Sequence, residues 1–339
     1  MTLTRRHVLA GLSSAPLVFS LARPASAAPA LKISHQFPGG TIEQGDFRDR
    51  LCRKFAEEVK RRAGVPVEFE VYPNSSLMKT NAQFSAMRKG ALDLSLFPLA
   101  YAGGELHICN LGLMPCLVTS YEQGAKWRTS KVGQAMTKAL EDKGIMFVSW
   151  LWQAGGVASR SRPVLVPDDA KGLKIRGGSR EMDLMFAAAG AQVSTMPSNE
   201  IYIGMQTGSL DAAVTSSTSL VSFRLDELSK SVTAPRGHSF WFMLEPLLMS
   251  KAVFDGLPLR LQKAIVEVGL EMEAFGEAES RKDDQILEQV YSAKGAKVAV
   301  LTNAVIAKWR AVAEASAWKD YAGKSPEAAD LLKLALQVA

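Results

Sequence analysis

The sequence has few of the residues that build disulfide frameworks and metal centres. Among 339 residues it has 3 cysteines, Cys52, Cys109 and Cys116, and 4 histidines. An odd number of cysteines excludes a fully paired disulfide scaffold. Cys109 and Cys116 are able to pair in an oxidising compartment, but buried free thiols are the simpler interpretation. There is no CxxC or HExxH pattern, so we expect neither a metal site nor a cofactor.

Sequence signatures of common enzymes are also absent. The chain has no GxSxG nucleophile elbow, no GxxxxGK[ST] phosphate loop, no GxGxxG after a predicted strand and no EF-hand loop. A Ser/His/Asp triad is assembled in space and leaves no such mark, but nothing in the sequence points to one. We therefore expect a protein that is not an enzyme, and we assign no catalytic residue.

Neither sign of charge is in large excess. Charged residues make up 22% of the chain and hydrophobic residues 47%, which is typical of globular proteins and excludes a disordered chain. The formal net charge is +6, and half of this excess comes from Arg5, Arg6 and Arg23. An excess this small over the remaining chain excludes an extended nucleic-acid-binding surface. The length suggests about two domains.

Residues 1–27 have the features of an export signal. Arg5 and Arg6 precede an apolar stretch at 8–21, and the small residues ASA at 25–27 suit a signal peptidase. The apolar stretch is shorter than the ~20 residues of a membrane-spanning helix, which makes a membrane anchor the less favoured alternative. We expect a mature protein from about Ala28 in a bacterial periplasm, and the paired arginines favour export by the Tat route.

Strand-like and helix-like patterns alternate along the rest of the chain. The segments with strand patterns are 31–35, 67–71, 92–96, 145–151, 173–176, 192–196 and 210–214. Amphipathic helical patterns separate them, which predicts parallel sheets covered by helices. Residues 230–250 look like two successive strands. From 259 to about 291 the helical period is unbroken, and such a helix would be ~50 Å long and able to span two domains.

Polar and aromatic side chains end several of these predicted strands. In open parallel sheets, ligands bind beyond the carboxyl ends of the strands. The residues that we place at these ends are Gln36, Phe97, Trp152, Arg176 and Thr215. They provide an amide, two aromatic rings, a guanidinium and a hydroxyl, a combination that suits a small polar anion.

Arg176 is the most informative of these candidates. Its guanidinium can hold a carboxylate through two parallel hydrogen bonds, which a lysine cannot do. Gly177 and Gly178 allow the backbone to approach a ligand, and the helix that follows Ser179 is expected to direct N–H groups to the same place. The alternatives are an arginine that pairs with an acid at the edge of a domain and, for the two aromatic rings, positions in the core.

Six stretches of the chain resemble DctP-type solute-binding proteins of tripartite ATP-independent periplasmic (TRAP) transporters. They are GLKIR at 172–176, MPSNEIY at 196–202, QTGSLD at 206–211, YPNSSL at 72–77, GALD at 90–93 and LMSK at 248–251. The resemblance covers essentially the whole mature chain. It implies an α/β, two-lobed fold like that of periplasmic binding proteins, in which each lobe is a sheet flanked by helices and a long helix spans both lobes.

The resemblance also divides the chain into parts. After the signal at 1–27, the main part of lobe I is expected at 28–153 and the main part of lobe II at 154–240. Residues 241–339 are expected to supply the hinge strands, the spanning helix and C-terminal helices that contribute to both lobes.

The family pattern gives roles to particular residues. It implies that Arg176 binds the ligand carboxylate and that Gln36 stands where a polar ligand contact is common. The chain departs from the pattern where many members have a second ligand arginine (Gly156), an asparagine (Thr215) or a polar contact (Pro98). The missing arginine and the retained aromatic pair favour a small or apolar monocarboxylate over a sugar such as sialic acid.

The sequence thus predicts a periplasmic receptor that binds a small organic acid and delivers it to the membrane subunits of a TRAP permease. The resemblance implies that an ion gradient, rather than ATP, drives transport. Two alternatives remain open, a solute receptor of an ATP-driven transporter or sensor system and an exported enzyme that acts on a carboxylate.

Overall fold

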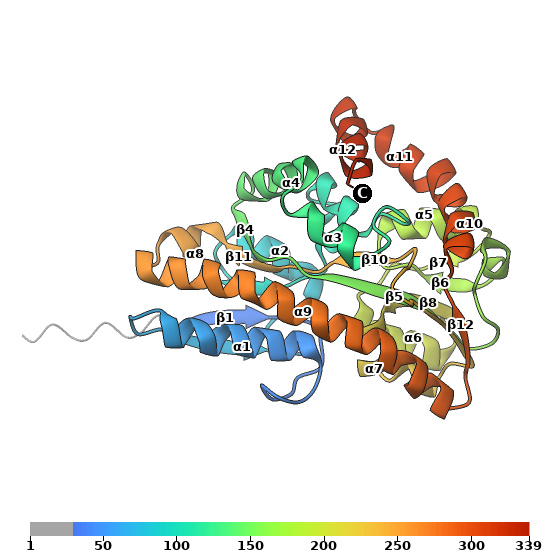
Figure 1. Cartoon of the computed structure of the whole chain (residues 1–339), viewed down its shortest axis with the longest axis horizontal. Helices are drawn as coiled ribbons and strands as arrows, with labels where there is room; N and C mark the ends of the chain where they lie inside the picture. Colours follow the sequence, from blue (N-terminus) through green and yellow to red (C-terminus); the bar gives the residue numbers. More distant parts are fainter. Residues whose placement is uncertain (1–29, 339) are drawn as a thin grey trace, which may run out of the picture.

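The computed structural model describes residues 30–338, which form two β-sheets surrounded by helices (Figure 1). The strands of the first sheet, in the order β2-β1-β3-β11-β4, are β2 (Glu68–Tyr72), β1 (Ala30–Ser34), β3 (Leu94–Leu96), β11 (Leu247–Ser250) and β4 (Ile145–Ser149). The second sheet has the order β12-β9-β5-β8-β6-β7, with β10 paired to β5. Its strands are β12 (Lys297–Val300), β9 (Ser231–Ala234), β5 (Trp152–Ser159), β8 (Ala212–Ser216), β6 (Lys174–Arg176), β7 (Gln192–Val193) and β10 (Phe242–Leu244).

Helices flank both sheets. The α-helices are α1 (Phe47–Arg62), α2 (Thr80–Arg88), α3 (Tyr121–Trp127), α4 (Lys131–Glu141), α5 (Arg180–Ala188), α6 (Ile201–Thr207), α7 (Ser217–Ser222), α8 (Lys251–Asp255), α9 (Leu259–Ala293), α10 (Asn303–Ala313), α11 (Lys319–Ala322) and α12 (Pro326–Leu336). Shorter turns are η1 (Leu99–Ala102), η2 (His107–Leu113), η3 (Pro167–Ala170), η4 (Ser198–Glu200), η5 (Leu225–Glu227) and the π-helical η6 (Glu314–Trp318).

The predicted parallel sheets are wrong in one respect, because both sheets are mixed. In the first sheet β11 runs antiparallel to β3 and β4, and in the second β5 runs antiparallel to β8 and β9. Only Trp150 and Leu151 connect β4 to β5, and only Glu245 and Pro246 connect β10 to β11. These short passages carry the chain directly from one sheet to the other. As a result Trp152 begins a strand and does not end one.

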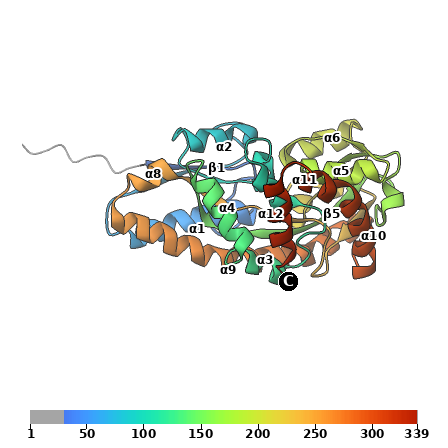
Figure 2. The ribbon, with the colours of Figure 1, turned by 90° about the horizontal axis from the view of Figure 1, so that it is seen from above.

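The long helix α9 confirms the predicted spanning element. It has 35 residues and packs on α1 and β4 beside the first sheet and on α7, β9 and β12 beside the second. Figures 1 and 2 show it crossing the whole molecule, from α8 at one end to β12 at the other. The two-lobed α/β fold is therefore confirmed; we call the part around the first sheet lobe I and the part around the second lobe II. The boundaries at 153 and 240 stay a prediction.

Most of the buried side chains are apolar, and the three cysteines lie among them. One core lies between the first sheet, α1 and α9, and includes Ile33, Phe55 and Ile265. Cys52, Cys109 and Cys116 are all buried and free, which confirms the interpretation as unpaired thiols. Within residues 30–338, no helix combines the length and the apolar character that crossing a bilayer requires.

Candidate functional site

Arg176 is the last residue of β6, and its side chain points into the protein with 1% exposure. Its Nε donates a hydrogen bond to the carbonyl oxygen of Met196 at 3.0 Å, and Nη1 donates to that of Val214 at 2.9 Å. Its Nη2 donates to the phenolic oxygen of Tyr101 at 2.7 Å. A guanidinium has five N–H groups, so one N–H on each terminal nitrogen has no acceptor among residues 30–338.

The partners of Arg176 are neutral. Two are backbone carbonyls and one is a phenol, so no carboxylate of the described residues is bound to this buried cation. Asp183 lies close enough for the charge of Arg176 to oppose the rise that burial causes in the pKa of the Asp183 carboxyl. The oxygens of Asp183, however, accept hydrogen bonds from the Gly177 N–H and the Thr195 hydroxyl. Arg176 therefore forms no ion pair with an acid of residues 30–338, and the alternative of a structural ion pair gains no support.

The second of the two glycines after Arg176 brings the backbone close to its side chain. Gly178 has φ +100°, and a Cβ at this position would lie 2.6 Å from Nη1 of Arg176. The backbone therefore approaches the guanidinium itself. Ser179 then caps α5, because its hydroxyl oxygen accepts from the Met182 N–H at 3.1 Å and its proton is donated to the Leu113 carbonyl.

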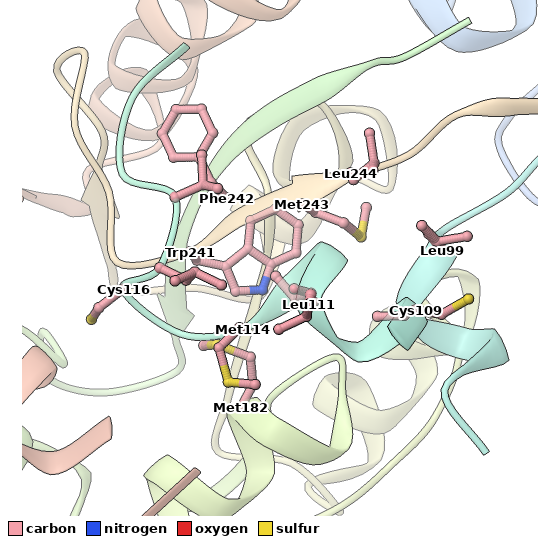
Figure 3. Close-up of a cluster of buried hydrophobic side chains, with 14 of the residues drawn as sticks. Leu99, Cys109, Leu111, Met114, Cys116, Met182, Trp241, Phe242, Met243 and Leu244 are labelled. Carbon is pink, nitrogen blue, oxygen red and sulfur yellow. The ribbon is translucent and has the colours of Figure 1, made fainter. Parts of the chain in front are cut away.

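Trp241 supports this turn from the other side. Its side chain is 1% exposed and its Nε1 donates to the Gly177 carbonyl oxygen at 3.4 Å. Figure 3 shows the indole among the side chains of Leu111, Met114 and Met182, so η2 and α5 contact the same ring. The position of Arg176 thus depends on packing between segments that are far apart in the sequence.

Tyr101 is hydrogen-bonded to Arg176 and was not among the residues predicted from the sequence. It lies in η1, which follows β3 of the first sheet, whereas Arg176 ends β6 of the second. Its hydroxyl oxygen accepts from Arg176 and also from the backbone N–H of Ser198 at 3.1 Å. The phenol thereby joins the two lobes. The only hint in the sequence was an aromatic residue with a polar tip shortly after the end of a predicted strand.

Of the other predicted residues of lobe I, Phe97 lies next to Tyr101, and Gln36 is buried at the end of β1. The rings of Phe97 and Tyr101 meet edge-on, with centroids 6.0 Å apart. The Oε1 of Gln36 accepts from the Thr80 hydroxyl at 3.4 Å, and its buried Nε2 has no partner among the described residues. Phe97 therefore supports the site, and Gln36 retains an unused donor.

In lobe II, Thr215 is brought close to Arg176 and Trp152 is not. Thr215 is buried in β8 directly after Val214, whose carbonyl oxygen binds the guanidinium. The indole of Trp152 instead packs edge-on against Trp127 with centroids 5.3 Å apart, in the core below α3. Trp152 thus lies in the core, which is the alternative that we gave for the aromatic rings. A contact between Trp152 and a ligand stays a prediction.

Gly156 is opposite Thr215 in the pairing of β5 with β8. A Cβ on Gly156 would lie 1.8 Å from the carbonyl oxygen of Thr233 in β9. The strand has no room for a side chain here, so only backbone is present where the family pattern led us to look for a second arginine.

A cavity of about 520 Å³ lies beside Tyr101 and the turn at Gly178, although Arg176 itself is not among the residues that line it. Its lining includes Tyr101 and Asn81 from lobe I, Gly178, Met196 and Pro197 from lobe II, and Lys324 from the C-terminal region. Volumes of this order are typical of small-molecule sites. Within residues 30–338, no group of three or more His, Cys, Asp or Glu side chains is arranged to hold a metal ion.

The chain matches the family model of the bacterial extracellular solute-binding proteins, family 7 (DctP), over residues 42–324. It belongs to this family. A solute-binding protein of Albidiferax ferrireducens is 56% identical over 336 residues, which are 98% of this chain and 99% of the relative. The C4-dicarboxylate-binding periplasmic protein DctP of Rhodobacter capsulatus is 28% identical over 274 residues, 79% of this chain and 78% of the relative.

Among solved structures, a TRAP periplasmic solute-binding protein from Rhodoferax ferrireducens with bound malonate is 58% identical. The superposition has a TM-score of 0.89 and covers 91% of this chain and 98% of the other. The predicted family is thus confirmed, and its members are periplasmic receptors that bind small carboxylates. The predicted preference for monocarboxylates gains no support, because malonate is a dicarboxylate. The predicted export signal lies outside the described residues.

Proposed function

We propose that this DctP-family receptor binds a small organic acid through its carboxylate at Arg176 and delivers it to a TRAP permease. The observation that supports this function is the buried guanidinium of Arg176, which has neutral partners and one unused N–H on each terminal nitrogen. A carboxylate has two oxygens and can accept both N–H groups at once, which is the strongest common arrangement between these groups.

The electrostatics of the closed lobes favour an anion. A buried charge without a counter-ion is costly, since the protein interior solvates it less well than water does. The carbonyls of Met196 and Val214 orient the guanidinium but do not neutralise it. A bound carboxylate would supply the opposite charge and would strengthen its hydrogen bonds by lying in a region of low dielectric constant.

The ligands that we propose are small carboxylic acids, including dicarboxylates. The cavity of about 520 Å³ is large enough for an acid of a few carbon atoms, and the malonate in the Rhodoferax ferrireducens structure supports this size class. Ligand binding between the lobes would shift the hinge equilibrium towards the closed form, which the permease would recognise. Export through a cleaved signal at 1–27, by the Tat route, is part of the same proposal.

Calorimetric titration of the mature chain tests this function. We expect malonate and pyruvate to bind and the uncharged analogue malonamide not to bind. Arg176→Lys keeps the positive charge but loses the two parallel N–H groups of the guanidinium. We expect the binding free energy to weaken by about 2–4 kcal/mol, which raises Kd roughly 30- to 1000-fold. The control is Arg236→Lys, because Arg236 is exposed and paired with Glu288 at 2.7 Å. An unchanged Kd in a folded Arg176→Lys variant would contradict the assignment.

A further inference from the structure

We propose that Tyr101 is a ligand-binding residue that closes the site, by donating its phenolic proton to the same carboxylate that Arg176 binds. This inference rests on the proposed function and adds to it a contact from lobe I. The ligand would then be held by donors from both lobes, so that binding and closure become one event.

The hydrogen bonds of the Tyr101 hydroxyl support the first step. Its oxygen accepts from Nη2 of Arg176 at 2.7 Å and from the N–H of Ser198 at 3.1 Å. A phenol has two lone pairs and one proton. Both bonds that join this hydroxyl to the described residues use the lone pairs, so the proton is left without an acceptor among residues 30–338.

The cavity supplies the place for that acceptor. Tyr101 and Gly178 both line the cavity of about 520 Å³. Arg176 is not part of this lining, but a Cβ on Gly178 would lie 2.6 Å from its Nη1, so the guanidinium lies directly behind the cavity wall. Arg176 keeps two free N–H groups and Tyr101 one free O–H group. A carboxylate has enough lone pairs to accept from all three donors. Each of these hydrogen bonds would be stronger than a bond to a neutral acceptor, because the carboxylate is charged.

The ring of Tyr101 is held in place independently of the ligand. Phe97, the residue directly after β3, packs edge-on against it at an interplanar angle of 87°. An aromatic pair of this geometry is favourable in itself, and it fixes the direction in which the hydroxyl points. Because the ring is attached to lobe I and both donors to its oxygen belong to lobe II, these bonds exist only while the lobes are closed.

Tyr101→Phe tests the inference, since it removes one oxygen atom and keeps the ring. We would measure Kd for malonate by calorimetry and the release rate by stopped-flow tryptophan fluorescence on the full mature chain. We expect Kd to rise about 10- to 30-fold, mainly through faster release, because closure loses both the bond to the ligand and the bonds between the lobes. The matched control is Tyr202→Phe, whose exposed hydroxyl donates to Glu227 at 3.0 Å and should leave binding unchanged.

The possible results separate the two proposals. If Arg176→Lys weakens binding and Tyr101→Phe leaves both Kd and the release rate unchanged, the role of Tyr101 is wrong while the proposed function stands. Tighter binding by Tyr101→Phe would show that the hydroxyl competes with the ligand for Arg176, which also overturns the role. If Arg176→Lys binds malonate normally, the carboxylate site is wrong and the inference fails with it. A melting temperature near that of the wild type would confirm that Tyr101→Phe is folded.

Discussion

Gly156 allows the packing of the second sheet to be tested with a single methyl group. It lies in β5, between β8 and β9, and the hydroxyl of Thr233 in β9 accepts from the neighbouring Val157 N–H at 2.7 Å. The added methyl of Gly156→Ala would lie 1.8 Å from the Thr233 carbonyl oxygen. That atom belongs to the backbone, so no side-chain rotation can relieve the clash and β9 must move away from β5.

The expected loss follows from this contact. Overpacking of a well-filled interior typically costs about 1–3 kcal/mol, and a clash with backbone belongs at the upper end of that range. The substitution also stabilises the folded state by about 0.5–1 kcal/mol, because glycine loses more backbone entropy than alanine when the strand folds. We therefore expect Gly156→Ala to lower the free energy of unfolding by about 2 kcal/mol and Tm by roughly 3 °C.

Urea and thermal unfolding measure this difference. The control is Gly104→Ala, because Gly104 is exposed and a Cβ there would meet no atom within 4 Å. A change of less than about 0.5 kcal/mol in Gly156→Ala, the scatter usual for surface substitutions, would refute the reasoning. It would show that β5 and β9 separate easily and that a larger side chain, including an arginine, has room at this position.

Two further predictions concern stability. Burial raises the pKa of Asp284 from 3.8 to about 7, so its contribution to stability is fully present below about pH 4 and is lost as pH rises through 7. Between pH 5 and pH 8 we expect the urea midpoint of the wild type to decrease. Asp284→Asn, which can still accept from the Tyr121 hydroxyl, should remove up to ~3 kcal/mol of this loss of stability, and an equal slope in both proteins would contradict the prediction. Ser179→Ala removes the cap of α5 and should cost about 1 kcal/mol in unfolding experiments, while no loss would show that the cap is dispensable.

Local signals in the sequence were enough for many elements of the fold, but the two strands expected at 230–250 are wrong, because this stretch contains β9, β10 and β11. The unbroken helical period from 259 predicted the spanning helix, which the structure gives as Leu259–Ala293. Ser179 predicted the start of α5, because a serine side chain that accepts a first-turn N–H acts over only a few residues. The position of Arg176 at the end of a strand was predicted in the same way. Such features depend on neighbours in the chain, and periodicity and spacing record them directly.

The tertiary structure decided the direction of strands and the partners of the site. Whether β5 runs parallel or antiparallel to β8 and β9 depends on how the strands of the second sheet meet in space. The predicted strand at 145–151 also concealed the passage from one sheet to the other at Trp150 and Leu151. The bond between Tyr101 and Arg176 joins residues that are 75 positions apart. No local pattern contains it, since it arises only when two lobes with separate sheets meet. The sequence by itself therefore determined the family, the helices and the buried cation, while closure of the lobes decided what surrounds that cation.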